Sequence, residues 1–427
     1  MHLIKRTLFV LSLLAVMASS DMVLAGGYDT PMLYSARHMG MGGTAIGYVY
    51  DPSALFHNPA GLGHTKFFSA TLDVSPLIGN IVSSPEKNDE ARNIKSNTVF
   101  APFFLAGAGI RVTDWLTLGI GAYPVASAAG SYDYVFTGGK DFTDLTKLVF
   151  IEVAPGIAVN LPFGLKFGAT YRVTLLSFDR VKGIDGSMLD IHMSGVNLAG
   201  FKLGLQWQPL PWLQAGIVYR HKTTTEVTAD ESTVVIDSGA TDMEFTLPSK
   251  LGVGVRADVG PLGVAVDAEY GFNSQNEVSI ISANPVSGDG APLLLKSQFR
   301  WEDSYTLRGG LEYSLLPKLL KLRTGYAYDS KVANKAYPSA FGTPPGATQV
   351  ITGGLGSDFT IGKVGMEVNL AYAYRFGSAT VTQEDIDSRP KDADGKADIE
   401  YKCDACSYPG DYEIALHGVY FDASVYF

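Results

Sequence analysis

Residues 412–427, at the end of the chain, alternate apolar and polar side chains and finish on an aromatic residue. The apolar positions are Val419, Phe421, Ala423, Val425 and Phe427, and the positions between them are Tyr420, Asp422, Ser424 and Tyr426. Because successive side chains of a β-strand point to opposite faces, the pattern predicts a strand with one apolar face and one polar face. A terminal strand of this kind is typical of an outer-membrane β-barrel whose last strand pairs with its first.

The N-terminus has the features of a secretory leader. Lys5 and Arg6 precede an apolar run over residues 8–17, and small residues follow up to Ala25. This order predicts a signal peptide over residues 1–25 that is cleaved after Ala25. Elsewhere the chain has no apolar run that approaches the roughly 20 residues of a membrane-spanning helix. Membrane-spanning strands are therefore the consistent interpretation.

The connections between the candidate strands are of two kinds, which alternate along the chain. Short ones, most of them rich in Gly, Pro or Asn, lie at residues 113–115, 160–164, 208–211, 260–263, 315–318 and 361–363. Long polar ones are expected at residues 76–97, 126–147, 179–195, 228–242, 274–295, 331–347 and 379–411. Bacterial outer-membrane barrels have short turns at the periplasmic end and long loops at the other. The sequence thus predicts an all-β fold, a 14-stranded antiparallel transmembrane β-barrel over residues 64–427.

The strand at residues 364–376 illustrates the two faces. One face carries Val364, Met366, Val368, Leu370, Tyr372, Tyr374 and Phe376, and the other carries Gly365, Glu367, Asn369, Ala371, Ala373 and Arg375. A soluble β-sandwich also alternates, but its apolar faces pack together and its polar faces meet water. The leader, the turn asymmetry, the strand count and the terminal aromatic residue favour the membrane barrel.

Residues 26–63 do not follow the strand pattern. They are rich in Gly and other small residues, and about 38 residues are too many for a simple connection to a first strand. The lumen of a fourteen-stranded barrel is also too wide for its own side chains to fill. We therefore expect residues 26–63 to form an N-terminal hatch that plugs the lumen.

The sequence assembles no catalytic or cofactor site. It contains no G-x-S-x-G nucleophile elbow, no P-loop and no H-E-x-x-H motif, and its histidines are scattered over different segments. A net charge of −10 argues against nucleic-acid binding, because such a chain displaces few phosphate counterions. We expect neither an enzyme nor a cofactor.

Two cysteines, Cys403 and Cys406, lie in the last long connection. In an exported chain the pair predicts a disulfide, whereas a structural metal site would need four ligands. The nearby acidic residues include Asp392 and Asp394, but the third ligand and the closing Glu of a calcium loop are missing. We expect a solvated acidic loop and no metal.

Several segments carry a resemblance to a known family. They are Ser35-Ala36-Arg37-His38-Met39-Gly40-Met41-Gly42-Gly43-Thr44-Ala45, Asp51-Pro52-Ser53-Ala54, Asn58-Pro59-Ala60-Gly61-Leu62, Thr246-Leu247-Pro248-Ser249-Lys250-Leu251-Gly252, Trp301-Glu302-Asp303-Ser304-Tyr305 and Leu322-Arg323-Thr324-Gly325-Tyr326-Ala327-Tyr328-Asp329. With these segments the chain resembles the FadL/TodX family of outer-membrane transporters for long-chain fatty acids and other hydrophobic compounds. The likeness covers essentially the whole mature chain.

The resemblance implies that the turn Asn58, Pro59 and Ala60 holds the hatch against the barrel wall; an ordinary turn is the alternative, since Asn and Pro favour turns. It also implies a kink in the third strand, residues 115–124, that opens the wall sideways toward the membrane. The residues of that strand that weaken pairing are Gly119, Gly121 and Pro124. The alternative is that Pro124 simply ends the strand at the rim.

The polar faces of the strands carry charges of both signs, and we expect most of them to pair with one another in the lumen. They are Lys166, Arg172, Lys202, Arg220, Arg256, Asp258, Asp267, Glu269, Arg308, Glu312, Arg323, Glu367 and Arg375. Because Arg binds carboxylates bidentately, Arg172 and Arg323 are the candidates for anchoring the carboxylate head group of a ligand.

The predicted function is an outer-membrane channel for passive uptake of hydrophobic molecules, either long-chain fatty acids or aromatic and aliphatic hydrocarbons, through the lumen and a lateral opening. The alternatives are a non-specific porin with an open aqueous lumen and an outer-membrane lipid hydrolase. Expected partners are a hydrophobic small-molecule ligand, outer-membrane lipid and lipopolysaccharide, and the barrel-assembly machinery. We expect a monomer in the bacterial outer membrane.

Overall fold

The computed structural model of the chain describes residues 34–87, 89–136, 139–287, 290–317, 319–341, 344–391, 398 and 400–427. The predicted signal peptide, residues 1–25, and residues 26–33 of the predicted hatch lie outside the described residues. Among the helices that are described, none is long and apolar enough to cross a membrane.

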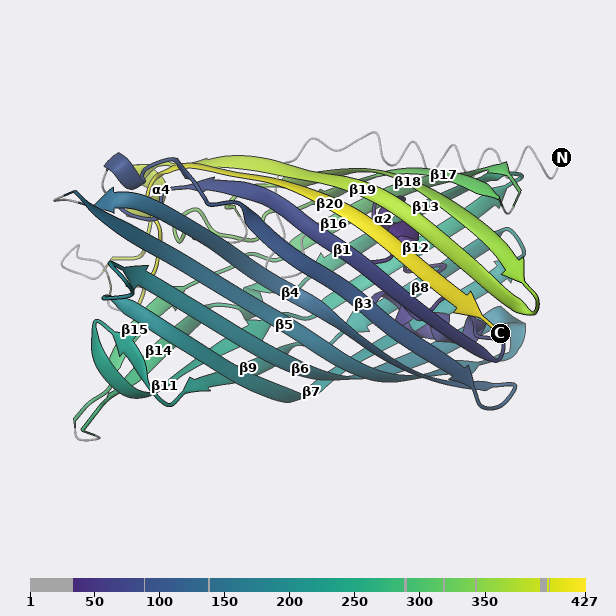
Figure 1. Cartoon of the computed structure of the whole chain (residues 1–427), viewed down its shortest axis with the longest axis horizontal. Helices are drawn as coiled ribbons and strands as arrows, with labels where there is room; N and C mark the ends of the chain where they lie inside the picture. Colours follow the sequence, from purple (N-terminus) through teal and green to yellow (C-terminus); the bar gives the residue numbers. More distant parts are fainter. Residues whose placement is uncertain are drawn as a thin grey trace.

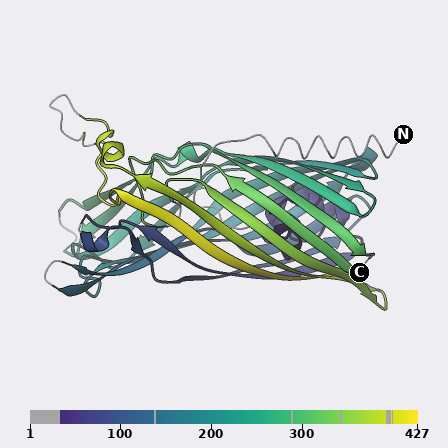
Figure 2. The ribbon, with the colours of Figure 1, turned by 90° about the horizontal axis from the view of Figure 1, so that it is seen from above.

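The described residues form a barrel of fourteen tilted antiparallel strands around one long axis (Figures 1 and 2). The strands are β1 (Phe68–Ser83), β3 (Val99–Arg111), β4 (Leu116–Phe136), β5 (Lys140–Asn160), β6 (Leu165–Gly183), β7 (Leu189–Leu210), β8 with β9 (Leu213–Arg220, Thr223–Ala229), β11 with β12 (Ile236–Leu247, Lys250–Val259), β13 with β14 (Leu262–Gly271, Val278–Pro285), β15 with β16 (Leu293–Gln298, Ser304–Leu316), β17 (Leu320–Asp329), β18 (Thr348–Ile361), β19 (Val364–Val381) and β20 (Gly410–Tyr426). Two short strands, β2 (Ile94–Lys95) and β10 (Ser232–Val234), extend the wall locally. The helical turns are α2 (Ala36–Met39), α3 (Ala54–His57), η1 (Pro59–His64), η2 (Asp89–Ala91), η3 (Pro162–Gly164), η4 (Asn273–Gln275) and α4 (Gln383–Asp387).

The last strand closes the barrel on the first. β20 pairs with β1 from Ser69 opposite Tyr426 to Val82 opposite Glu413, and its other edge pairs with β19. Closure leaves neither edge of the terminal strands free to pair with another chain. The prediction of a closed fourteen-stranded antiparallel barrel is confirmed.

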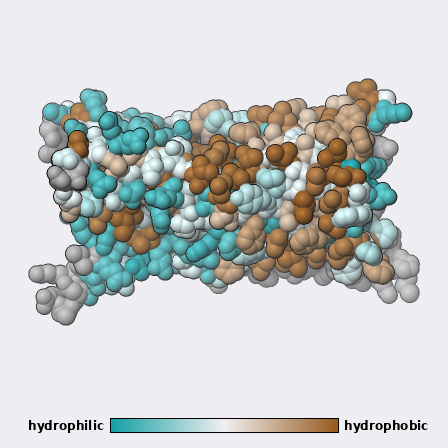
Figure 3. Space-filling view, turned by 90° about the horizontal axis from the view of Figure 1, so that it is seen from below, coloured by the Kyte–Doolittle hydropathy of each residue, from teal (hydrophilic) through white to brown (hydrophobic). Residues whose placement is uncertain are grey.

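The outer face of the wall carries an apolar belt. Side chains such as Leu72 and Phe421 point outward and are exposed, whereas Asp73 and Asp422 on the same strands point inward and are buried. Figure 3 shows apolar side chains gathered over the right-hand part of the barrel and hydrophilic ones toward the left-hand end. We call the right-hand end, where β20 ends, the hatch end, and the opposite end the mouth end (Figure 1).

Five of the expected long loops, at residues 76–97, 126–147, 179–195, 228–242 and 274–295, are wrong in extent, because strands run far into them. Here the pattern of faces is reversed: His192 and Glu226 point outward, while Met193 and Val227 point inward and are buried. The wall therefore rises beyond the membrane, where its outer face meets water. The segments at 331–347 and 379–411 are connections as expected, apart from short strand ends and α4.

Candidate functional site: a plugged barrel with a gap in its wall

Residues 34–64, here called the hatch segment, lie inside the barrel at the hatch end. Figure 1 and Figure 2 show their purple helices enclosed by strands. The helix α2 contacts β18, β19 and β20, whereas α3 and η1 contact β4, β5, β6 and β7 on the other side. Nearly all residues of the segment are buried. The segment thus reaches across the lumen from wall to wall, and a gating role for it stays a prediction.

The side chain of Asn58 joins the hatch segment to the wall. Its Nδ2 donates to the backbone carbonyl of Ile46 at 2.8 Å, and to those of Leu205 on β7 at 3.1 Å and Ile217 on β8 at 3.3 Å. Its Oδ1 accepts the backbone N–H of Ala60 at 3.2 Å, so the same side chain caps η1. Pro59, the first residue of η1, lacks an N–H that would need a partner there. The turn is therefore both a helix cap and a contact with the wall.

Three strands present glycines to this turn. A Cβ at Gly168 on β6, Gly204 on β7 or Gly216 on β8 would lie under 3.0 Å from backbone or side-chain atoms of Ile46, Asn58 or Pro59. Any larger residue would hold the hatch segment away from the wall. Sequence reasoning missed these glycines, although glycine inside a strand often marks the close approach of another backbone.

Two buried wall carboxylates accept backbone N–H groups of the hatch segment. Asp267 on β13 accepts from Ala45 at 2.7 Å and from Ile46 at 3.0 Å. Asp422 on β20 accepts from Arg37 at 3.1 Å. These two side chains therefore fix the backbone of the hatch segment to β13 and β20.

An ionic cluster joins the hatch segment to the opposite wall. The Arg37 guanidinium lies 3.7 Å from Glu312 on β16 and 3.7 Å from Glu367 on β19. Glu312 also pairs with Arg256 and with Arg323, each at 2.7 Å. Arg256, Glu312 and Arg323 were expected to pair with other charges in the lumen, and they do so here. The hatch residue that joins them, Arg37, was not among the charges expected to pair.

The wall has a gap between β3 and β4. The two strands pair only from Arg111 opposite Thr117 to Ala106 opposite Ala122. Beyond the gap, Asn97, which precedes β3, donates its N–H to the carbonyl of Ser131 on β4 at 2.7 Å. Between these points residues 98–105 and 123–130 share no ladder pairs, although β4 stays paired with β5. We call this interruption the β3–β4 gap.

The gap alters the prediction for the third strand. The strand continues to Phe136, so the alternative that Pro124 ends it at the rim is wrong. Pro124 lies at the edge of the gap and beside a β-bulge in the pairing with β5. Gly119 and Gly121 lie in the paired part, where a Cβ would touch Leu62 and Leu55 of the hatch segment. The two glycines therefore allow close approach of the hatch segment.

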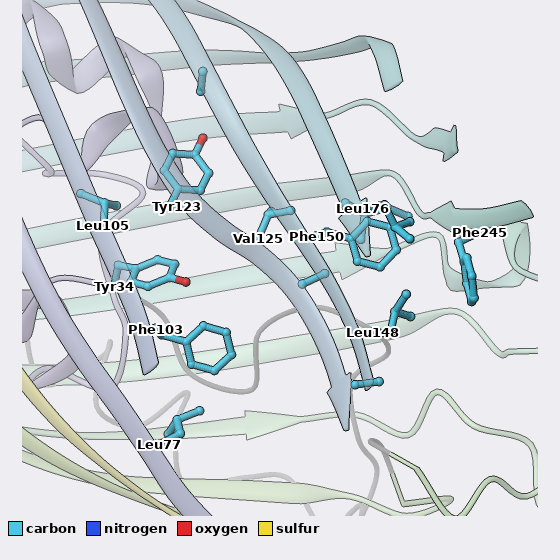
Figure 4. Close-up of a cluster of buried hydrophobic side chains, with 14 of the residues drawn as sticks. Tyr34, Leu77, Phe103, Leu105, Tyr123, Val125, Leu148, Phe150, Leu176 and Phe245 are labelled. Carbon is cyan, nitrogen blue, oxygen red and sulfur yellow. The ribbon is translucent and has the colours of Figure 1, made fainter. Parts of the chain in front are cut away.

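A cavity of about 390 Å³, here called the wall cavity, passes through the gap. Its lining includes Leu77 and Phe103, which point into the lumen, and Phe100 and Phe104, which point out of it. One cavity thus touches side chains of both faces of the wall at the β3–β4 gap. Figure 4 shows Leu77 and Phe103 at one side and Leu148 near Phe150 at the other, all of them members of one buried apolar cluster.

A second cavity of about 160 Å³, the mouth cavity, lies under the loops at the mouth end. Its apolar lining includes Phe178, Met243, Phe245 and Ile281. Loop residues between 337 and 341 and between 403 and 408 cover it. The mouth cavity and the wall cavity share the lining residues Ala128 and Leu148, so the two cavities are neighbours.

Cys403 and Cys406 are joined by a disulfide in the loop that covers the mouth cavity. Within that loop the N–H of Asp404 donates to the carbonyl of Lys296 on β15 at 2.8 Å, and the N–H of Lys296 donates back to the Asp404 carboxylate at 3.1 Å. The loop is therefore docked on the wall. Among the described residues no group of three or more metal-ligating side chains is found.

Arg172 and Arg323 lie on different sides of the lumen, on β6 and β17. Arg172 is fully buried and donates from Nε to Glu152 at 2.8 Å. Arg323 belongs to the ionic cluster and also donates to Asn369 at 2.6 Å. Neither belongs to the described linings of the two cavities, and an anchoring role for either stays a prediction.

Known proteins share this architecture. The family described as "Outer membrane protein transport protein (OMPP1/FadL/TodX)" matches residues 16–413. A Pseudomonas aeruginosa FadL homologue is 13% identical, with 94% of this chain and 99% of that chain covered and a TM-score of 0.69. The P. putida toluene transporter TodX is 16% identical, with 92% of this chain and 99% of that chain covered and a TM-score of 0.65. The Ralstonia pickettii toluene transporter TbuX is 17% identical, with 92% of this chain and 98% of that chain covered and a TM-score of 0.62.

No curated protein sequence matches the chain. At these low identities, the similarity to the solved structures shows the fold alone. The family and these structural neighbours are transporters and channels, not enzymes. Because the family match extends over most of the chain and the barrel has the expected strand number, this protein belongs to the OMPP1/FadL/TodX family and is a β-barrel of the bacterial outer membrane.

Proposed function

We propose that this protein is a passive channel that takes small hydrophobic molecules from the mouth cavity to the wall cavity and releases them sideways through the β3–β4 gap into the outer membrane. The observation that carries the proposal is that one apolar cavity is lined by side chains of both faces of the wall. The solved toluene transporters TodX and TbuX have the same fold and support a hydrophobic ligand.

Transport of an apolar ligand along this route needs no energy source. An apolar ligand that leaves water for an apolar lining gains about 0.8 kcal/mol per buried CH₂. The hydrocarbon core of the membrane is as apolar as the cavity, so the last step of lateral release has little cost. Net flow then follows the concentration of the ligand.

The hatch segment argues against the porin alternative. A porin needs an open aqueous lumen, whereas here residues 34–64 reach from wall to wall and are nearly all buried. The cavities lie along the wall toward the mouth end, and the wall cavity reaches the gap with the hatch segment docked. The hydrolase alternative finds no support among the transporters and channels that match.

The test blocks the shared part of the path. Ala128→Trp places a large ring where the two cavities meet, and we expect protein-dependent uptake of labelled toluene by intact cells to fall to that of cells without the protein. Val135→Trp is the matched control, because Val135 lies on the same strand but is exposed on the outer face. Folding of both variants is checked by the heat-dependent shift of the barrel in gel electrophoresis. Uptake through folded Ala128→Trp at the normal rate would remove the proposed route.

A further inference from the structure

The cations that line the two cavities are each paired with a carboxylate of the protein. We propose, building on the proposed function, that this channel selects uncharged hydrophobic molecules, such as hydrocarbon rings or chains, and excludes ionised carboxylates such as fatty-acid anions.

In the wall cavity the charged lining residue that faces the lumen is Arg375. Its Nη1 donates to Asp329 Oδ2 at 2.6 Å, and the other oxygen of Asp329 accepts the hydroxyl of Thr306 at 2.7 Å. Both members of the ion pair are largely buried. Lys147 also lines this cavity, on the outer face, and lies 3.8 Å from the Asp179 carboxylate.

In the mouth cavity the lining cations are Arg180 and Lys182. Arg180 pairs with the buried carboxylate of Asp144 and lies over the ring of Phe341, 4.8 Å from its centre. Lys182 lies 3.1 Å from Glu86 and 3.5 Å from Asp144. Among the described residues, each cation along the path thus has a carboxylate partner.

An ionised ligand meets two costs on this path. A carboxylate that keeps no partner loses its hydration inside an apolar passage. A carboxylate that binds Arg375 or Arg180 either displaces Asp329 or Asp144 and leaves that buried charge unpaired, or stands as a second carboxylate beside one cation, and both arrangements are unfavourable. An uncharged hydrocarbon meets neither cost, because it carries no charge and binds through apolar contacts alone.

The experiment compares ligands that share one chain. Protein-dependent uptake is the difference between cells with the wild-type protein and cells without it, measured for toluene, methyl decanoate and decanoate at about pH 8, where decanoate is ionised. We expect toluene and the ester to be taken up and decanoate to be at least about tenfold slower. Lowering the pH to about 5 protonates a large share of the acid, and its uptake should then rise toward that of the ester.

The outcomes separate the two proposals. Equal uptake of decanoate and its ester at about pH 8 would overturn the selectivity for uncharged ligands and leave the channel function standing. Uptake of none of the three ligands would overturn the channel function itself, and the selectivity with it.

A variant that frees one cation tests the cause. Asp329→Asn keeps an acceptor for Thr306 but removes the charge that neutralises Arg375, and we expect decanoate uptake to rise about tenfold relative to the ester. Asp258→Asn is the matched control, because Asp258 also pairs with an arginine, Arg256 at 2.8 Å, but lines neither cavity. A folded Asp329→Asn protein that still excludes decanoate would refute the role of the Arg375 pair. The comparison of ligands on the wild-type protein does not depend on the folding of either variant.

Discussion

The substitution Gly204→Ala adds one methyl group where β7 meets the hatch segment. A Cβ at Gly204 would lie under 3.0 Å from Asn58 Oδ1 and from the ring of Pro59. Alanine fits the backbone there, because Gly204 is not among the residues with positive φ. Gly204 is held on both sides by ladder pairs, opposite Gly168 and Val218. The hatch segment therefore has to move instead of the wall.

The size of the effect follows from the hydrogen bonds of Asn58. Moving this side chain breaks its bonds to the carbonyls of Ile46, Leu205 and Ile217 and strains its bond to Ala60. At about 0.5–1.5 kcal/mol for each net hydrogen bond, docking of the hatch segment weakens by about 2–4 kcal/mol. A loss of about 2.7 kcal/mol raises the ratio of undocked to docked segment by about a hundredfold.

Ion conductance in a planar bilayer reports the undocked state, because a displaced hatch segment leaves an aqueous lumen. We expect Gly204→Ala to raise the frequency of opening events about a hundredfold while the barrel stays folded. Gly365→Ala is the control, since a Cβ at Gly365 of β19 would meet no atom closer than 3.7 Å. Conductance of Gly204→Ala equal to wild type, or an equal rise in the control, would refute the reasoning.

Two further perturbations act on the same docking. Asp267→Ala removes the acceptor of two backbone N–H groups of the hatch segment and should weaken docking by about 2–4 kcal/mol. The Asp267→Asn protein, which keeps an acceptor, should conduct less than the Asp267→Ala protein. A larger conductance for Asp267→Asn than for Asp267→Ala would contradict this. Burial lowers the pKa of His57 to about 3 and the pKa of His38 well below its usual value, so undocking restores a higher affinity for protons. The histidines taken alone therefore weaken docking as the pH falls below about 6.5, by about 2 kcal/mol for His57 at pH 5, and this contribution raises the conductance. Burial raises the pKa of Asp51 to about 6, which offsets part of this loss; a conductance that falls on acidification would count against the dominance of the histidines.

The sequence predicted the barrel well where the membrane dictates the pattern. In the apolar belt, lipid requires apolar side chains outside, and the alternation of residues 364–376 and 418–427 is plain. Beyond the belt the outer face meets water and the apolar side chains turn inward, as Met193 and His192 illustrate. Polar segments there resemble loops in the sequence, because alternation alone does not tell which face is lined by lipid.

The site was predicted less completely than the barrel. The family resemblance points to the turn at Asn58, but its partners on the wall are backbone carbonyls, which leave no trace in the sequence. The docking glycines Gly168, Gly204 and Gly216 lie far from Asn58 in the chain and resemble any strand glycine until the barrel brings them together. The pairing of Arg323 with Glu312 and Asn369 is likewise a matter of register between strands.

The hatch segment and the β3–β4 gap are parts of one arrangement. An unpaired strand edge inside an apolar wall leaves backbone groups without partners, which is costly away from water. Pro124 has no N–H to satisfy, and its carbonyl accepts the hydroxyl of Tyr34 at 2.6 Å. On the same strand Tyr123 donates to the carbonyl of Leu55 at 2.9 Å. The hatch segment thus supplies contacts at the edge of β4 where β3 supplies none, so undocking it should also destabilise the open form of the proposed exit.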